Sequence, residues 1–427
     1  MRVPRPTAEP RAVVVVGASA RAWAASAVRG GWRVHTVDLF ADGDLIALAA
    51  SATRLGEGYP TALPAAVSRL PAGPLTYTGA LENHPGVLAA LALDRPLAGV
   101  PPEALAAVRT PAGLARLARA ARMTFPATRA SARGLPRDGS WLIKPLHGAG
   151  GAGIEPWTGP TTARPGPDCW QRRVTGRAWA ATYLIAPVGP RLVGVARQLL
   201  GPARRGAAPF AWCAGVTRPP RHLPGAVHTA LVRLGEALWR RDGLRGMIGV
   251  DFLVTPSGEP VLIEINPRPT ASAELHERHE GRSLAAAHLE CFGYPDAGRA
   301  TPPEALPGAW AKALVRTPAP CRADDRLVDR VTALSARWTR LDGGWPALAD
   351  IPTAGAVLPD HGPLLSVFAH GRHATAATRA LAARRNAVDE LLRDWLRQRA
   401  AARPRRPLRK TGTASGTRPR SSPGRSP

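Results

Sequence analysis

The chain has 427 residues, 45% of them hydrophobic, and a formal net charge of +26. This length and composition suit two or three domains with buried cores rather than one small module. The sequence has no run of about 18 apolar residues that could span a membrane. Its first residues also lack the apolar segment of a signal peptide, so we expect a cytoplasmic protein.

The positive charge comes almost entirely from arginine, because lysine occurs only at Lys144, Lys312 and Lys410. Arginine, alanine, glycine and proline are all abundant, which favours a compositional bias and a solvated basic surface over a nucleic-acid-binding face. Residues 401–427 are basic and rich in proline, serine and glycine, so we expect a disordered tail there. We expect no nucleic-acid binding outside this tail. The four cysteines lie far apart without zinc spacing, so neither disulfides nor structural zinc is expected.

Residues 1–100 show the pattern of a small α/β domain. Four valines at 13–16 predict a strand, Gly17 marks a turn, and a helical stretch leads to a second strand that ends at Asp38. Asp38 stands about where a ribose-binding acid would in a dinucleotide-binding domain. Gly17 is the only glycine of the turn, however, so the fingerprint that lets a backbone approach a pyrophosphate is missing. We expect a Rossmann-like domain without nicotinamide or flavin.

The rest of the chain alternates predicted helices and strands. We expect helices over residues 110–122, 226–241, 273–292 and 373–400. We expect strands within 168–185, around a turn at Thr175 and Gly176, and over 355–358 and 364–368. Residues 101–296 would form a central domain, and prolines near 302–307 mark the start of a β-rich C-terminal segment over 297–400.

The strongest chemical signal is a predicted strand pair between residues 248 and 266. A turn centred between Ser257 and Gly258 places Asp251 opposite Glu264, and alternation puts both on the same face as Asn266. The sequence neighbours of the two acids are apolar, so the pair is expected to be buried. Opposed buried carboxylates are costly unless a cation compensates them. Oxygen ligands of this kind suit Mg²⁺ whose octahedron is completed by nucleotide phosphates.

The alternative interpretation of this strand pair is structural. It is a half-exposed hairpin whose acids pair with arginines such as Arg245 or Arg268.

A second signal is a predicted strand over residues 141–145 that contains Lys144 and is followed by glycines. These are Gly148, Gly150, Gly151 and Gly153. Prolines directly downstream prevent a helix from starting there, so strand, loop and strand is the better prediction than a Rossmann turn. A glycine hairpin with a lysine on its leading strand can fold over a triphosphate, whose charge the backbone N–H groups and the ammonium offset. The alternative is a flexible surface turn.

Together these features resemble the ATP-grasp superfamily over about residues 101–292. The lysine strand and glycine loop are followed, about 100 residues later, by Asp251 and the run Glu264-Ile265-Asn266-Pro267-Arg268. The spacing of the two acids is similar to that of D-alanine ligases, whereas the run is similar to biotin carboxylase and carbamoyl phosphate synthetase. The resemblance implies the α/β class, as an α+β ATP-grasp fold preceded by a small Rossmann-like domain.

The resemblance also implies ATP and two Mg²⁺ ions as cofactors, with Mn²⁺ as the alternative metal. Asp251 and Glu264 would bind one ion, and Glu264 and Asn266 the second. Arg268 would face the transferring phosphoryl group, and Lys144 would contact the phosphates under the glycine loop.

The predicted hinge departs from the family. Gln171, Arg173 and Val174 stand where it usually meets adenine and ribose, and acids common there are replaced by Gln171, Arg173 and Ala178. An earlier phosphate-binding lysine is also absent, with Arg116 or Arg109 as substitutes. Residues 270–274 are expected to face the acceptor substrate, or else to be an ordinary helix start.

We therefore expect an ATP-dependent ligase that activates a carboxylate as an acyl phosphate and transfers it to an amine or similar nucleophile. The altered hinge motivates one alternative, an ATP-grasp-like nucleotide-binding protein with little or no turnover. The other is a basic nucleic-acid-associated protein. The small-molecule substrates are not predicted, and a homo-oligomer is left open.

Overall fold

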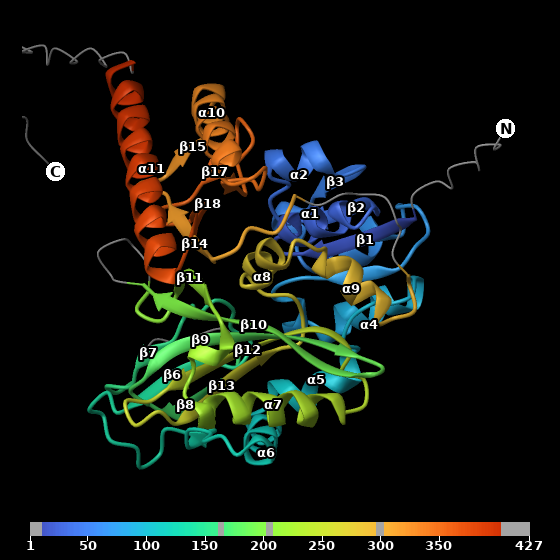
Figure 1. Ribbon diagram of the computed structural model, residues 1–427, viewed down its shortest axis with the longest axis vertical. Helices are drawn as coiled ribbons and strands as arrows, with labels where there is room; N and C mark the ends of the chain where they lie inside the picture. Colours follow the sequence, from blue (N-terminus) through green and yellow to red (C-terminus); the bar gives the residue numbers. More distant parts are fainter. Residues whose placement is uncertain (1–10, 161–165, 202–207, 296–302, 403–427) are drawn as a thin grey trace, which may run out of the picture.

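The computed structural model describes residues 11–160, 166–201, 208–295 and 303–402. An N-terminal α/β domain lies beside a large antiparallel sheet, and two long C-terminal helices flank the end of that sheet (Figure 1). Within the described residues, no helix is long and apolar enough to cross a membrane.

The N-terminal domain has a four-stranded parallel sheet in the order β3-β2-β1-β4. Its elements are β1 (Ala12–Gly17), α1 (Arg21–Arg29), β2 (Arg33–Asp38), α2 (Gly43–Leu48), β3 (Ser51–Arg54), η1 (Gly56–Gly58), α3 (Leu63–Val67), β4 (Leu75–Tyr77), η2 (Leu81–Asn83) and α4 (Pro85–Asp94). The valines at 13–16 are fully buried because alternate residues enter two different cores. A strand covered on both faces needs such an unbroken apolar run.

Asp38 stabilises the turns around it. Its position in the sequence had suggested that it could bind a ribose. The side chain is fully buried, and its carboxylate accepts the N–H groups of Ala20 at 3.1 Å, Phe40 at 3.2 Å and Ala41 at 2.7 Å. Its hydrogen-bonding capacity is thus used within the domain.

The central region contributes a small sheet and most of a large one. Its elements are α5 (Pro102–Arg109), α6 (Pro111–Ala121), β5 (Thr128–Arg129), β6 (Trp141–Pro145), β7 (Glu155–Pro156), β8 (Asp168–Arg172), β9 (Arg177–Ala186), β10 (Gly189–Leu200), β11 (Trp212–Arg218), η4 (Pro220–His222), α7 (Gly225–Trp239), β12 (Gly246–Val254), β13 (Pro260–Asn266), α8 (Ala273–Glu280) and α9 (Leu284–Glu290). The small sheet has the order β5-β8-β6-β7. Helices α6 and α7 cover the face of the large sheet opposite α8 and α9 (Figure 1).

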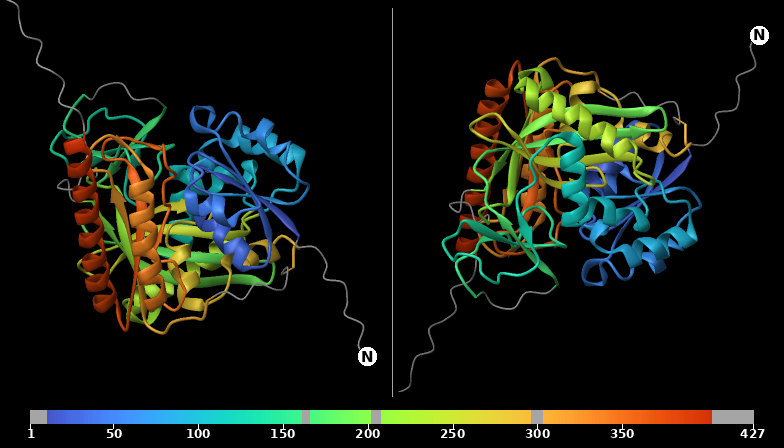
Figure 2. Two further views of the ribbon diagram at one scale, coloured as in Figure 1. Left: turned by 90° about the horizontal axis from the view of Figure 1, so that it is seen from above. Right: turned by 90° about the horizontal axis from the view of Figure 1, so that it is seen from below.

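The C-terminal segment joins the same large sheet, whose order is β13-β12-β9-β10-β11-β14-β18-β16. Its elements are β14 (Ala309–Arg316), β15 (Cys321–Arg322), α10 (Asp325–Leu341), β16 (Leu348–Ala349), β17 (Val357–Leu358), β18 (Pro363–Gly371) and α11 (Ala374–Ala402). Helices α10 and α11 run side by side against its strands (Figure 2). The predicted disordered tail lies almost wholly outside the described residues.

Two expectations about these elements are wrong. The helix expected over 273–292 is two helices, because Gly281 adopts φ +66° and ends α8. Helix α10 was missed in a segment expected to be β-rich. The strands expected on either side of Thr175 and Gly176 are confirmed as β8 and β9. They belong to different sheets, so this turn links the small sheet to the large one.

His288 of α9 connects the N-terminal domain to β12. Its Nδ1 accepts the Met247 N–H at 2.8 Å, and its Nε2 donates to the Ala98 carbonyl at 2.9 Å. This arrangement requires the neutral imidazole, and burial lowers the pKa of His288 to about 4.

The neutral state of His288 makes unfolding depend on pH. Below about pH 6.5 the unfolded chain takes up a proton that folded His288 refuses, so stability is lost as pH falls through this range. Between pH 7.5 and pH 5, wild type should lose about 2 kcal/mol more unfolding free energy than His288→Gln. Urea titrations measure this difference, with the exposed His228→Gln as control. Equal losses in wild type and His288→Gln would contradict the assignment.

Candidate active site

A cavity of about 500 Å³ lies between the small sheet and the large sheet. Most of the predicted site residues line it. They are Lys144, Gly150, Gly151, Gln171, Arg173, Val174, Asp251, Glu264, Asn266 and Arg268. Gly148 and Gly153 do not line it. The cavity thus brings together the two signals that were more than 100 residues apart in the sequence.

The predicted pairing of the hairpin is present, and a bulge maintains it. Asp251 pairs with Glu264 and Gly249 with Asn266, but Phe252 pairs with Leu262, which leaves Ile263 as an extra residue. On the turn side of this bulge, each residue of β12 therefore pairs with the residue of β13 one position before the one that the predicted register gives. If the pairing on the turn side continued past Phe252 without the bulge, Ile263 would lie opposite Asp251 and Glu264 would point to the other face of the sheet.

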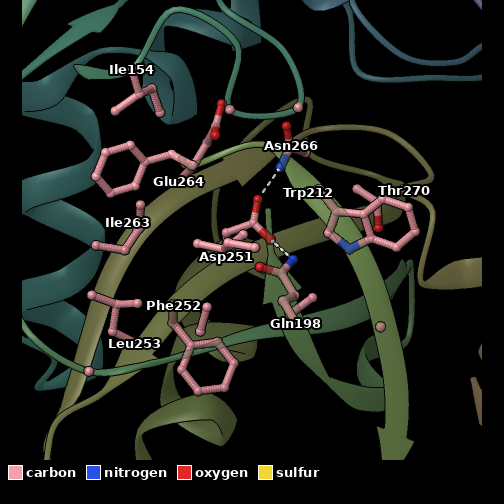
Figure 3. A pocket seen from close by; sticks show the side chains of 18 of the residues that line it. Ile154, Gln198, Trp212, Asp251, Phe252, Leu253, Ile263, Glu264, Asn266 and Thr270 are labelled. Carbon is pink, nitrogen blue, oxygen red and sulfur yellow. Dashed lines mark hydrogen bonds between the residues drawn. The ribbon is translucent and has the colours of Figure 1, made fainter. Parts of the chain in front are cut away.

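The two acids are held by different kinds of partner. Asp251 accepts hydrogen bonds from the amides of Gln198 at 2.7 Å and Asn266 at 3.1 Å (Figure 3). Glu264 accepts one from Arg109 at 2.6 Å. The alternative that arginines pair with these acids therefore holds for Glu264, although the arginine is neither Arg245 nor Arg268.

The surroundings shift the pKa values of the two acids in opposite directions. Burial, and then the neighbouring Glu264, raise the pKa of Asp251 to about 6. Burial also acts to raise the pKa of Glu264, but Lys144 and Arg109 outweigh it and the pKa is lowered. Asp251 is consequently the acid that still lacks a positive neighbour in contact.

The donor set fits a magnesium ion only if the nucleotide supplies oxygens too. Among the described residues, no group of three or more His, Cys, Asp or Glu side chains could hold a metal ion. The hairpin offers two carboxylates and the Asn266 amide. Mg²⁺ is commonly bound by one or two carboxylates together with phosphates and water.

Arg268 lies at the edge of the cavity and is fixed by an acid from the N-terminal domain. Its Nε donates to Glu82 at 2.8 Å, and the Glu82 side chain is only 1% exposed. Burial acts to lower the pKa of Arg268, but Glu82 outweighs it and the pKa is raised. The guanidinium therefore stays charged beside Asn266.

The glycine loop connects β6 and β7, which pair as the predicted hairpin. The Gly150 carbonyl accepts the Trp212 N–H at 3.1 Å. Gly151 has φ +78°, and a Cβ there would lie 2.0 Å from the Phe210 carbonyl oxygen. The loop thus rests against the start of β11, and position 151 requires glycine for both its conformation and its space.

Asn83 links this loop to the acids, and sequence analysis missed it. Its Nδ2 donates to the carbonyls of His147 at 3.2 Å and Gly148 at 3.3 Å, while its Oδ1 accepts from Arg109 at 2.8 Å. Arg109 in turn binds Glu264. No local pattern reveals such a chain of contacts, since Asn83 lies in a short turn of another domain.

The hinge residues lie at one end of the cavity. Gln171, Arg173 and Val174 line it, and the Gln171 amide donates to the Thr128 hydroxyl at 3.2 Å. Gln171, Arg173 and Ala178, which stand where the family commonly has acids, all line the cavity.

Only the first part of residues 270–274, which were expected to face a substrate, lies at the cavity. Thr270, Ala271 and Ser272 line the cavity, and Ser272 makes no capping hydrogen bond to α8. Glu274 instead binds Arg21 at 2.6 Å and Lys312 at 2.9 Å. His276 is buried, and neither it nor His279 lines the cavity.

Residues 114–272 match the family model of the ATP-grasp domain. The chain therefore contains an ATP-grasp domain over these residues. The match confirms the predicted superfamily and fold class, and it spans the lysine strand, the glycine loop and the acid hairpin. No sequence among curated proteins matches the chain.

Solved structures share the ATP-grasp fold over most of the chain. Carboxyaminoimidazole ribonucleotide synthase from Aspergillus clavatus, complexed with ATP, is 13% identical, with a TM-score of 0.62 over 90% of this chain and 99% of its own. N5-carboxyaminoimidazole synthetase from Staphylococcus aureus, complexed with ADP, is 12% identical, with a TM-score of 0.62 over 88% and 96%. The biotin carboxylase domain of a single-chain bacterial carboxylase is 18% identical, with a TM-score of 0.59 over 92% and 97%. Identities this low show the common fold alone.

Alanine at Gly151 should weaken nucleotide binding by the ATP-grasp domain, because a Cβ would collide with the Phe210 carbonyl and push the loop away. Gly150→Ala is the matched control, since φ is +61° there and a Cβ meets no atom within 4 Å. We expect the dissociation constant for Mg-ADP, measured by calorimetry, to be at least about tenfold higher in Gly151→Ala than in Gly150→Ala. Similar constants would show that this packing does not position the loop.

Aspartate at Asn83 should release the glycine loop, because it removes the amide that donates to the His147 and Gly148 carbonyls. We expect hydrogen exchange at residues 148–153 to become about tenfold faster. Asn386→Asp on the exposed face of α11 is the control. Unchanged exchange in Asn83→Asp would mean that other contacts hold the loop.

Proposed function

We propose that this protein is an ATP-dependent ligase that activates a carboxylate with Mg-ATP and transfers the acyl group to an amine or similar nucleophile. The observation that carries the proposal is the opposition of Asp251 and Glu264 in a cavity that Lys144, Arg268 and the glycine loop also line. An exposed structural hairpin would need neither the cavity nor the surrounding cations.

The arrangement suits phosphoryl transfer to a carboxylate. Asp251, Glu264 and Asn266 would hold magnesium, which neutralises charge on the phosphates. Lys144 and Arg268 would contact the γ-phosphoryl group while a carboxylate oxygen attacks phosphorus in line and ADP leaves. The nucleophile then attacks the acyl carbon and displaces phosphate. Positioning and charge neutralisation supply the catalysis, so no serine, cysteine or histidine nucleophile is needed.

Nucleotide would lie with adenine at the hinge. Leu142, Ile154, Val174, Leu253 and Ile263 line that end of the cavity and offer an apolar slot for a planar base. Polar contacts to the base would come from backbone groups of residues 171–174, since the side chains there include no acid.

The hinge also supports a second candidate, an ATP-grasp protein that binds nucleotide with little or no turnover. Without acids at Gln171, Arg173 and Ala178, the ribose hydroxyls have fewer acceptors than in the family pattern. Calorimetry with Mg-ATP, followed by ADP assays across pools of carboxylates and amines, distinguishes the two. Binding without ADP formation favours the second candidate.

Glu264→Ala tests the ligase directly, because Glu264 would bind both magnesium ions. We expect ADP release with candidate acids and amines to fall more than about 100-fold relative to wild type. Glu259→Ala is the matched control, since Glu259 is exposed in the turn of the same hairpin. Equal rates in Glu264→Ala and wild type would eliminate this site as the catalytic one.

A further inference from the structure

The cavity continues across the large sheet, beyond the proposed nucleotide site. Figure 3 shows Trp212 and Thr270 on one side of the Asp251–Asn266 contact, with Leu253 and Ile263 on the other. Trp212, Gly215, Thr270, Ser272 and Leu275 line this part. We call the space that these five residues line the far chamber.

None of the residues of the far chamber carries a charge. Its two hydroxyl groups are already engaged, since Thr270 Oγ1 lies 3.0 Å from Ser272 Oγ and Ser272 Oγ lies 3.1 Å from Thr182 Oγ1. The remaining lining is the indole of Trp212, the backbone of Gly215 and the buried side chain of Leu275.

With Asp251 holding magnesium, as proposed above, the other charged residues near the far chamber are paired with one another. Arg268 binds Glu82, and Glu274, next to Leu275 in α8, binds Arg21 and Lys312. A second charge on a ligand in the chamber would lose its water without gaining a partner. The chamber therefore selects against acidic groups and against additional ammonium groups.

Gly215 determines how much room the chamber has. A Cβ at this position would lie 3.6 Å from Leu275 Cδ1 and 3.7 Å from Trp212 Cζ2. These are ordinary contact distances, so a larger side chain would extend into the space between the indole and Leu275. Glycine therefore leaves space for an apolar group beside the Trp212 indole.

We propose that the far chamber binds the uncharged apolar body of the nucleophile, a primary amine that carries a ring or branched hydrocarbon and no second charge. The inference rests on the proposed ligase function. The carboxylate substrate must meet the γ-phosphoryl group beside Arg268 and the acids, and the amine must reach the acyl carbon away from the departing phosphate. The far chamber is the part of the cavity that remains for it.

The test uses the full chain saturated with Mg-ADP and the probe 2-phenylethylamine. Saturation-transfer NMR should show contact between the protein and the ring protons of the probe. L-glutamate and 1,5-diaminopentane, which carry additional charges, should show at least fivefold less transfer.

Gly215→Leu fills the slot and should reduce ring-proton transfer at least fivefold while the dissociation constant for Mg-ADP changes less than twofold. Gly225→Leu is the matched control, because Gly225 is exposed and a Cβ there meets no atom within 4 Å. If Gly215→Leu does not fold, Trp212→Ala replaces it, and the same loss of transfer is expected.

The outcomes separate the two proposals. Absence of Mg-ADP binding to wild type would defeat the proposed function itself. Mg-ADP binding without ring transfer, equal transfer in Gly215→Leu, or equal transfer from the charged probes would overturn the far-chamber assignment alone. Loss of ring transfer on addition of Mg-ADP would place the probe in the adenine slot and would overturn it as well.

Discussion

The opposition of two half-buried carboxylates, Asp251 and Glu264, is the constraint around which the rest of the molecule is arranged. Such a pair is unfavourable by itself, as the raised pKa of Asp251 indicates. The bulge at Ile263 nevertheless keeps both acids on the cavity face. Lys144 and Arg109, from two other elements, then lower the pKa of Glu264. The sheet therefore keeps two acids side by side, and the charge of Asp251 is the less well compensated of the two.

The N-terminal domain completes this site although it contributes no acid to the hairpin. Its short turn η2 supplies Glu82 to Arg268 and Asn83 to both Arg109 and the glycine loop. Each contact fixes a cation beside the large sheet or fixes the glycine loop. The glycine loop, the acids and Arg268 are thus connected through one turn, so a movement of this domain would be felt by all three.

A buried charge cluster joins the same domain to the C-terminal segment. Arg21 of α1 binds Glu274 of α8 and Asp350 after β16, and Lys312 of β14 binds Glu274 as well. Arg278 stacks on Phe368, with its guanidinium carbon 3.6 Å from the ring centroid. Because Glu274 is fully engaged here, its charge is withheld from the neighbouring cavity. That pairing explains why the far chamber remains neutral next to an acid.

The sequence by itself determined which side chains share a face and which loop is glycine-rich, because strand alternation and turn chemistry are local. The sequence was therefore sufficient to identify Asp251, Glu264 and Asn266 as neighbours on one face. It was also sufficient to identify Lys144 and its glycine hairpin. Only the tertiary structure decided which residues join them. Arg109 meets Glu264 across 155 residues and Asn83 meets Gly148 across 65, contacts that depend on domain packing. The break at Gly281 is a local C-cap that the apolar periodicity concealed. The position of Thr175 and Gly176 between two sheets was set by packing.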